Sequence, residues 1–240
     1  MKRYVSVFEM IVRSSIYKVL LIVVGMIAVE TVFFYQTLMN PQGVNLELYI
    51  DQSQYSLIFK IAYVLVTIVI LLPGRNRGSV QSYTLQRLRI KEKYLFWLQA
   101  LYNVLAYVIL WGVQLVMLFV SAALYRKYLP ASAIWTNQTL FLAFHRNDFM
   151  HSIFPLEDIY GIVLLLFMLI VPAVTAAAFT KLQRRGKFVW EIFVVVTTVM
   201  IAFPRFLAQD ITFVVMVTLF IGVCALMRWS IYREVEKNEG

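Results

Sequence analysis

The sequence predicts an all-α, polytopic membrane protein with six transmembrane helices, and three observations carry this prediction. Of the 240 residues, 61% are hydrophobic and only 15% are charged, whereas a typical soluble domain is about 45–50% apolar and about 25% charged. The mean hydropathy is +0.76, which indicates more apolar surface than one soluble core can bury. The single cysteine, Cys224, lies in an apolar stretch and cannot form an intrachain disulfide. A soluble enzyme, a disordered regulator and a disulfide-rich secreted scaffold are therefore excluded.

Six apolar stretches approach the length of about 20 residues that a spanning helix needs. They cover approximately residues 19–36, 57–72, 94–124, 159–179, 188–203 and 211–229. The second and fifth stretches are short, so we expect these two helices to extend into their flanks. The third is long, which predicts a tilted helix or one that projects beyond the lipid. Residues 19–240 thus form one six-span domain.

The distribution of lysine and arginine predicts that both termini lie in the cytoplasm. With this orientation, 17 of the 22 cationic side chains fall on the inner side and 5 on the outer side. The formal net charge of +9 then indicates anchoring to the anionic inner leaflet rather than binding to nucleic acid. We expect a multi-pass protein of the plasma membrane, the bacterial cytoplasmic membrane.

Residues 1–18 have the pattern of an amphipathic helix. Lysine, arginine and glutamate share one arc of the helical wheel, and apolar residues share the other. The apolar arc contains Tyr4, Val5, Phe8, Ile11 and Val12. We expect this helix to lie in the inner headgroup layer before the first span; the alternative is a solvated leader.

The basic segment between the second and third spans is the most informative soluble part. Residues 75–94 carry six cations and one acid, and Ser79 is a candidate N-cap for a short helix. One side of that helix would carry Val80, Tyr83, Thr84, Arg87 and Leu88. Such a helix could insert into a groove on a partner protein. The alternative is that the basic residues only set the topology of the chain.

The outer loop, residues 125–158, is too short for an independent core and must lie against the membrane or other helices. The stretch 134–154 contains charged side chains that are costly at mid-bilayer, so an interfacial helix is expected there rather than a seventh span. The candidates for acid–base or metal chemistry are His145, Asp148, His151, Glu157 and Asp158. His145 and His151 are six residues apart, a spacing that does not place both on one helical face. The alternative is a loop whose polar groups lie among the lipid headgroups.

Four polar residues within the expected spans are candidates for lining a pathway. Glu30 is an acid within the first span, and an intramembrane acid is a functional-site hypothesis because its burial is costly. Gln99, Asn103 and Gln114 recur near one face of the third span. Hydrogen bonding between helices is the alternative for the three amides, and for Glu30 the alternative is a side chain that reaches the outer interface. Pro172 is expected to kink the fourth span.

The sequence contains none of the common catalytic or nucleotide-binding motifs. It lacks GxxxxGK[ST], HExxH, CxxC and GxSxG. We therefore expect no catalytic residue, no metal site and no cofactor in this chain.

These features together resemble the membrane subunit of a type-2 ABC exporter. Tyr83–Ile90 resembles the phrase threonine-leucine-x-arginine-leucine-proline that this class often carries between its second and third spans, with Arg89 in the place of proline. Members have an amphipathic N-terminal helix, six spans and a cytoplasmic coupling helix. The resemblance implies that ATP and Mg²⁺ bind to a separate ABC ATPase subunit. The residues expected to contact the ATPase are Val80, Tyr83, Thr84, Leu85, Arg87, Leu88 and Arg89.

The function that the resemblance implies is a permease subunit that couples ATP hydrolysis in the partner to export. Two permease subunits, identical or related, would enclose the cavity. An antibiotic peptide or a lipid-like molecule is the expected cargo. The alternatives are a membrane-embedded enzyme that uses the outer-loop histidines and acids, and a scaffold or sensor that moves no solute.

Overall fold

The computed structural model describes five segments of the chain. They are residues 2–39, 45–75, 92–128, 137–156 and 159–184, together with six separate helical positions between residues 214 and 225. Every element in these segments is a helix, and they contain no strand. The helices are α1 (Lys2–Met39), α2 (Leu46–Gln52), α3 (Tyr55–Arg75), α5 (Glu92–Tyr128), α6 (Asn137–Arg146), α7 (Asp148–Ile153) and α8 (Ile159–Arg184). The all-helical prediction is confirmed for this part of the chain.

Three of these helices are long and apolar enough to cross a membrane. They are α1 over Tyr4–Met39, α5 over Lys93–Tyr128 and α8 over Ile159–Lys181. Helices α2 and α3 pass the same test only as a pair joined at a bend of 47°, so the described segments contain three such helices, or four if the pair is one span. The expected spans 188–203 and 211–229 lie outside the described residues except for the six separate positions. The count of six stays a prediction.

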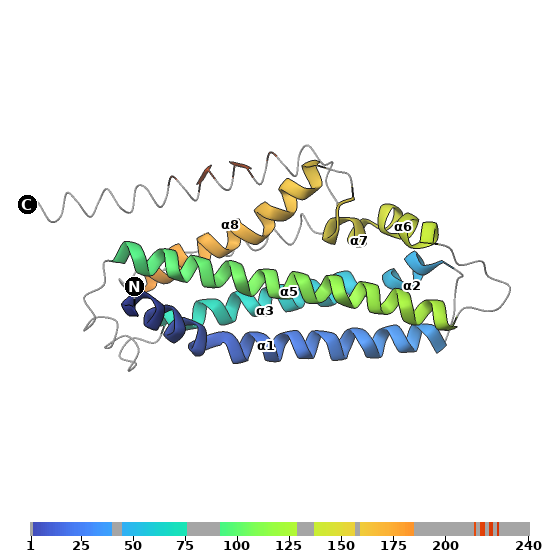
Figure 1. The fold of residues 1–240 in the computed structure, drawn as a ribbon, viewed down its shortest axis with the longest axis horizontal. Helices are drawn as coiled ribbons and strands as arrows, with labels where there is room; N and C mark the ends of the chain where they lie inside the picture. Colours follow the sequence, from blue (N-terminus) through green and yellow to red (C-terminus); the bar gives the residue numbers. More distant parts are fainter. Residues whose placement is uncertain are drawn as a thin grey trace, which may run out of the picture.

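Helices α1, α3 and α5 run side by side along the long axis of the molecule, and α8 crosses α5 at an angle (Figure 1). The most extensive contact joins α5 to α8, and α1 packs against both α3 and α5. The beginnings of α1 and α5 lie at the same end of the bundle as the last residues of α3 and α8 (Figure 1). Helices α2, α6 and α7 lie toward the opposite end (Figure 1).

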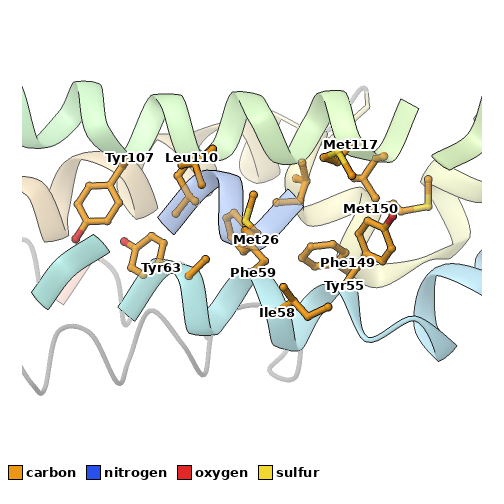
Figure 2. Close-up of a cluster of buried hydrophobic side chains, with 14 of the residues drawn as sticks. Met26, Tyr55, Ile58, Phe59, Tyr63, Tyr107, Leu110, Met117, Phe149 and Met150 are labelled. Atoms are coloured by element: carbon orange, nitrogen blue, oxygen red, sulfur yellow. The ribbon is translucent and has the colours of Figure 1, made fainter. Parts of the chain in front are cut away.

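The core receives side chains from all seven helices and consists of aliphatic, aromatic and methionine residues. Figure 2 shows part of it, with Met26, Tyr55, Ile58, Phe59, Tyr63, Tyr107, Leu110, Met117, Phe149 and Met150 labelled. The outer faces are also apolar, because side chains such as Leu21, Ile61 and Val116 are more than half exposed. A soluble monomer rarely exposes so much contiguous apolar surface. An apolar exterior is suited to a protein embedded in lipid.

The N-terminal residues do not form a separate helix, because α1 continues without interruption from Lys2 to Met39. Figure 1 shows a bend between the start of α1 and its long straight part. The apolar arc of this start packs partly on α5, where Ile11 and the fully buried Val7 contact Leu95 and Tyr102. Phe8 and Val12 of the same arc pack against these four buried residues. Tyr4 makes a ring contact with Tyr94, and Val5 is exposed. The position of this segment in the headgroup layer stays a prediction.

Helix α2 lies in the connection between the expected spans 19–36 and 57–72. Asn45 precedes the helix as its N-cap, and Glu47 lies in the first turn. The side chains of Leu46, Tyr49 and Ile50 are buried, at the spacing of one helical face. Gln54, with a φ of 57°, marks the break between α2 and α3.

Candidate functional site

A line of buried polar side chains runs along the face of α5 that meets the other helices. Gln99, Asn103, Gln114 and Ser121 are all at most 3% exposed. Their spacing keeps them near one side of the helix. We call these residues and their contacts on neighbouring helices the polar tract. Its members are Gln99, Asn103, Tyr107, Gln114 and Ser121 of α5, Glu30 of α1, and Tyr55, Tyr63 and Thr67 of α3.

At one end of the polar tract, Asn103 joins α5 to α8. Its Nδ2 donates to the Ala173 carbonyl at 2.9 Å, and its Oδ1 accepts from Gln99 Nε2 at 3.2 Å. The structure therefore brings the two amides together and uses one of them in a contact between helices. Whether they also line a pathway stays a prediction.

The centre of the polar tract compensates for the proline in α8. Pro172 has no N–H, so the carbonyl four residues earlier, that of Met168, lacks its helical donor. The hydroxyl of Tyr63 donates to this carbonyl at 2.9 Å. The Tyr63 ring stacks on Tyr107 with centroids 4.7 Å apart, and the Tyr107 hydroxyl hydrogen-bonds to Thr67 at 2.7 Å (Figure 2). Neighbouring helices thus satisfy the group that the proline frees, as a membrane helix requires.

Toward the other end of the polar tract, Glu30 of α1 meets Gln114 of α5. Both side chains are fully buried. They are close enough to interact, yet neither the carboxyl oxygens of Glu30 nor the amide atoms of Gln114 have a hydrogen-bond partner among the described residues. Nearby, the Tyr55 and Ser121 hydroxyls bond to each other, and Tyr55 lies within electrostatic reach of Glu30. The sequence had placed Glu30 and Gln114 among its candidates without indicating that they meet.

Several members of the polar tract were not expected from the sequence. Tyr55, Tyr63 and Tyr107 have the pattern of ordinary aromatic residues in apolar helices, and nothing local separates them from the exposed tyrosines. One signal did exist: Pro172 requires that some donor reach the Met168 carbonyl. It identifies the acceptor but not the helix that supplies the donor.

The described residues 137–156 of the outer loop form two short helices, α6 and α7, that are tied to α2 and α5. Asn147 caps α7 by accepting from the Met150 N–H at 2.9 Å, and its Nδ2 donates to the Asp51 carboxylate at 2.8 Å. Trp111 of α5 donates to the Ile153 carbonyl at 2.8 Å. This arrangement breaks the expected interfacial helix at Asn147 and packs both pieces on the bundle.

The two histidines of the outer loop come together despite their spacing in the sequence. The rings of His145 and His151 are 5.8 Å apart and nearly perpendicular. His151 is buried, whereas His145 and Asp148 are exposed. Within the described residues no three potential ligands converge to hold a metal ion; Glu157 and Asp158 lie outside them. An enzymatic role for this group stays a prediction.

The residues expected to contact an ATPase, from Val80 to Arg89, lie outside the described residues. The structure places only the helices on either side. Helix α3 ends at Arg75 and α5 begins at Glu92, and both ends lie at the same end of the bundle (Figure 1).

A comparison of the chain with known protein families, with characterised proteins and with solved structures finds no match.

Proposed function

We propose that this chain is the membrane permease subunit of an ATP-driven exporter of the ABC type-2 class. In this proposal the chain crosses the bacterial cytoplasmic membrane six times with both termini inside. A separate ABC ATPase binds ATP and Mg²⁺. A second permease subunit, identical or related, completes the transport unit.

The observation that carries the proposal is the excess of basic residues toward one end of the bundle. Of the twelve lysines and arginines in the described helices, eight lie in the helix halves toward the end where α3 and α8 finish and α5 begins (Figure 1). Four lie toward the opposite end, including Arg126 and Lys127 in the last turn of α5. Lysine and arginine mark the cytoplasmic side of a membrane protein. The segment 76–91, with its threonine-leucine-x-arginine-leucine phrase, connects the end of α3 to the beginning of α5. The proposed contact for an ATPase would thus lie at the cytoplasmic face.

The polar tract supports a transport role over a purely structural one. Polar residues within transmembrane segments are costly and often mark a substrate or ion pathway. Most members of the polar tract form hydrogen bonds between helices, and a role in stability alone would explain these bonds. Glu30 and Gln114 differ, because no such bond within the described segments explains their burial.

Purification of the tagged chain from its native membrane tests the proposal. We expect vanadate-sensitive ATPase activity to co-purify with the chain in mild detergent, and to be lost from Leu88→Asp at an equal yield of folded protein. Ser82→Asp is the matched control, because Ser82 lies on the opposite side of the expected helix. A wild-type preparation without ATPase activity, or a Leu88→Asp preparation that retains it, would contradict the proposal.

A further inference from the structure

Glu30 and Gln114 present four polar atoms that no described residue satisfies. Both side chains are fully buried between α1 and α5. The atoms are the two carboxyl oxygens of Glu30 and the nitrogen and oxygen of the Gln114 amide. Buried polar groups are nearly always hydrogen-bonded, so this pair requires an explanation.

Among the described residues, no positively charged group interacts with Glu30. From α5 the group that meets Glu30 is the neutral amide of Gln114. From α3 the titratable group in reach is Tyr55, whose hydroxyl is bonded to Ser121. No titratable group of α2 interacts with Glu30 among the described residues. An ionised Glu30 would therefore be a buried charge without a counter-charge from these elements, which is strongly unfavourable.

A protonated Glu30 complements Gln114 fully. A carboxylic acid has one O–H donor and one carbonyl acceptor, and a primary amide has an N–H donor and a carbonyl acceptor. The two groups can exchange two hydrogen bonds in a closed ring. An ionised carboxylate has no donor, so it can accept from the Gln114 NH2 group but leaves the Gln114 carbonyl without a partner. Rotation about the terminal torsions of Glu and Gln is soft, which makes the paired geometry accessible from the observed contact.

We propose that Glu30 and Gln114 form a proton-binding site that joins α1 to α5. A proton taken from water adds to one carboxylate oxygen of Glu30, and the resulting acid pairs with the Gln114 amide. Release of the proton leaves a buried charge between the two helices and weakens their contact. The site therefore links the packing of α1 on α5 to pH. This inference does not depend on the proposed ATPase partner.

Infrared spectroscopy of the purified protein in lipid tests the site directly. At neutral pH we expect a carboxylic-acid C=O stretching band that is lost in Glu30→Gln and kept in Glu9→Gln. Glu9 is the matched control because it lies on the same helix and is exposed. Gln114→Leu should shift the band to higher frequency, since a hydrogen bond to the carbonyl lowers this frequency. A carboxylate band that Glu30→Gln removes at neutral pH would overturn the proposal.

Thermal unfolding provides a second measurement that does not require a spectrum of every variant. Between the ordinary pKa of a glutamate, about 4.3, and the pH at which the buried Glu30 ionises, the folded wild type holds one more proton than its unfolded state. Its stability should therefore fall as the pH rises through this interval and level off above it. Glu30→Gln, whose amide can pair with Gln114 without a proton, should reduce this slope, and Glu9→Gln should not. If Glu30→Gln does not fold, the wild-type infrared spectrum decides the question: the acid band must convert to a carboxylate band as the pH rises. Stabilisation by sodium over choline in the wild type, without an acid band, would identify a metal-cation site and overturn the proposal.

Discussion

The hydroxyl of Tyr63 donates a 2.9 Å hydrogen bond to the carbonyl of Met168, the group that Pro172 leaves without a donor in α8. A side chain from a different helix thus reduces the cost of a proline inside a long apolar helix. Because Tyr63 also stacks on Tyr107, one residue links α3, α5 and α8. The contact explains how α8 keeps a proline in its interior.

Tyr63→Phe should lower the free energy of unfolding by about 1–3 kcal/mol, the cost of an unsatisfied buried polar group. The ring remains, so the change isolates the hydroxyl. In the Pro172→Ala background the same substitution should cost less, because the alanine backbone supplies an N–H to the Met168 carbonyl. The wild type, the two single variants and the double variant form a double-mutant cycle, which is measured by thermal unfolding in detergent. Tyr17→Phe is the control, because Tyr17 is exposed. Equal costs in both backgrounds would refute the link between Tyr63 and the proline.

Asn103→Leu should destabilise the bundle by about 0.6 kcal/mol and by no more than about 1.7 kcal/mol, the average and the maximum measured for hydrogen bonds between membrane helices. The substitution removes the bond from Asn103 to the Ala173 carbonyl and with it a contact between α5 and α8. Gln99→Leu should cost less, because Gln99 bonds only within α5 in the described segments. Unfolding of both variants by a denaturing detergent measures the difference. A larger cost for Gln99→Leu would show that this account of the contact is wrong.

Asn147→Ala should loosen the outer helices without unfolding the bundle. The substitution removes the N-cap bond of α7, worth about 0.5–2 kcal/mol, and the bond to Asp51. Hydrogen exchange should become faster in α6 and α7 and stay unchanged in α5. Asn45→Ala is the control, because Asn45 occupies the N-cap of α2 but makes no side-chain cap bond. Faster exchange of α6 and α7 in Asn45→Ala, or unchanged exchange of these helices in Asn147→Ala, would contradict the contacts described for Asn147.

The proposed topology predicts which side of the membrane each loop faces. In a Cys224→Ser background, a cysteine at position 148 should react with a membrane-impermeant maleimide in intact cells, since Asp148 is exposed on α7. A cysteine at position 79 should react only after the cells are permeabilised. The reverse pattern would overturn the proposed orientation.

The long helices were predictable because apolar length alone predicts them in lipid. The stretch 159–179 is contained in α8, and 94–124 in α5. Two shorter helices also have a local signal in the sequence. Asn45, with buried positions at 46, 49 and 50, has the pattern of a capped helix, and Asn147-Asp148 has that of a helix start.

The interior of the candidate site was less predictable because its contacts join residues far apart in the chain. Glu30 and Gln114 lie on different helices, and a single sequence contains no information on which faces of two apolar helices meet. The same is true of Tyr63. Pro172 identifies the carbonyl that needs a donor, but the sequence does not identify Tyr63 as that donor. Polar residues in a span can therefore be selected from the sequence, whereas their pairing requires the packed bundle.

In the proposed exporter, the basic segment between α3 and α5 transmits force from an ATPase. The most direct measurement places a photo-crosslinking amino acid at position 88, and separately at position 82, in the complex purified from the native membrane. We expect a crosslink from position 88 to a polypeptide that binds ATP. The yield of this crosslink should change when vanadate traps the nucleotide. Position 82 should give only a weak crosslink. A crosslink from position 88 only to lipid or to the chain itself would contradict the account.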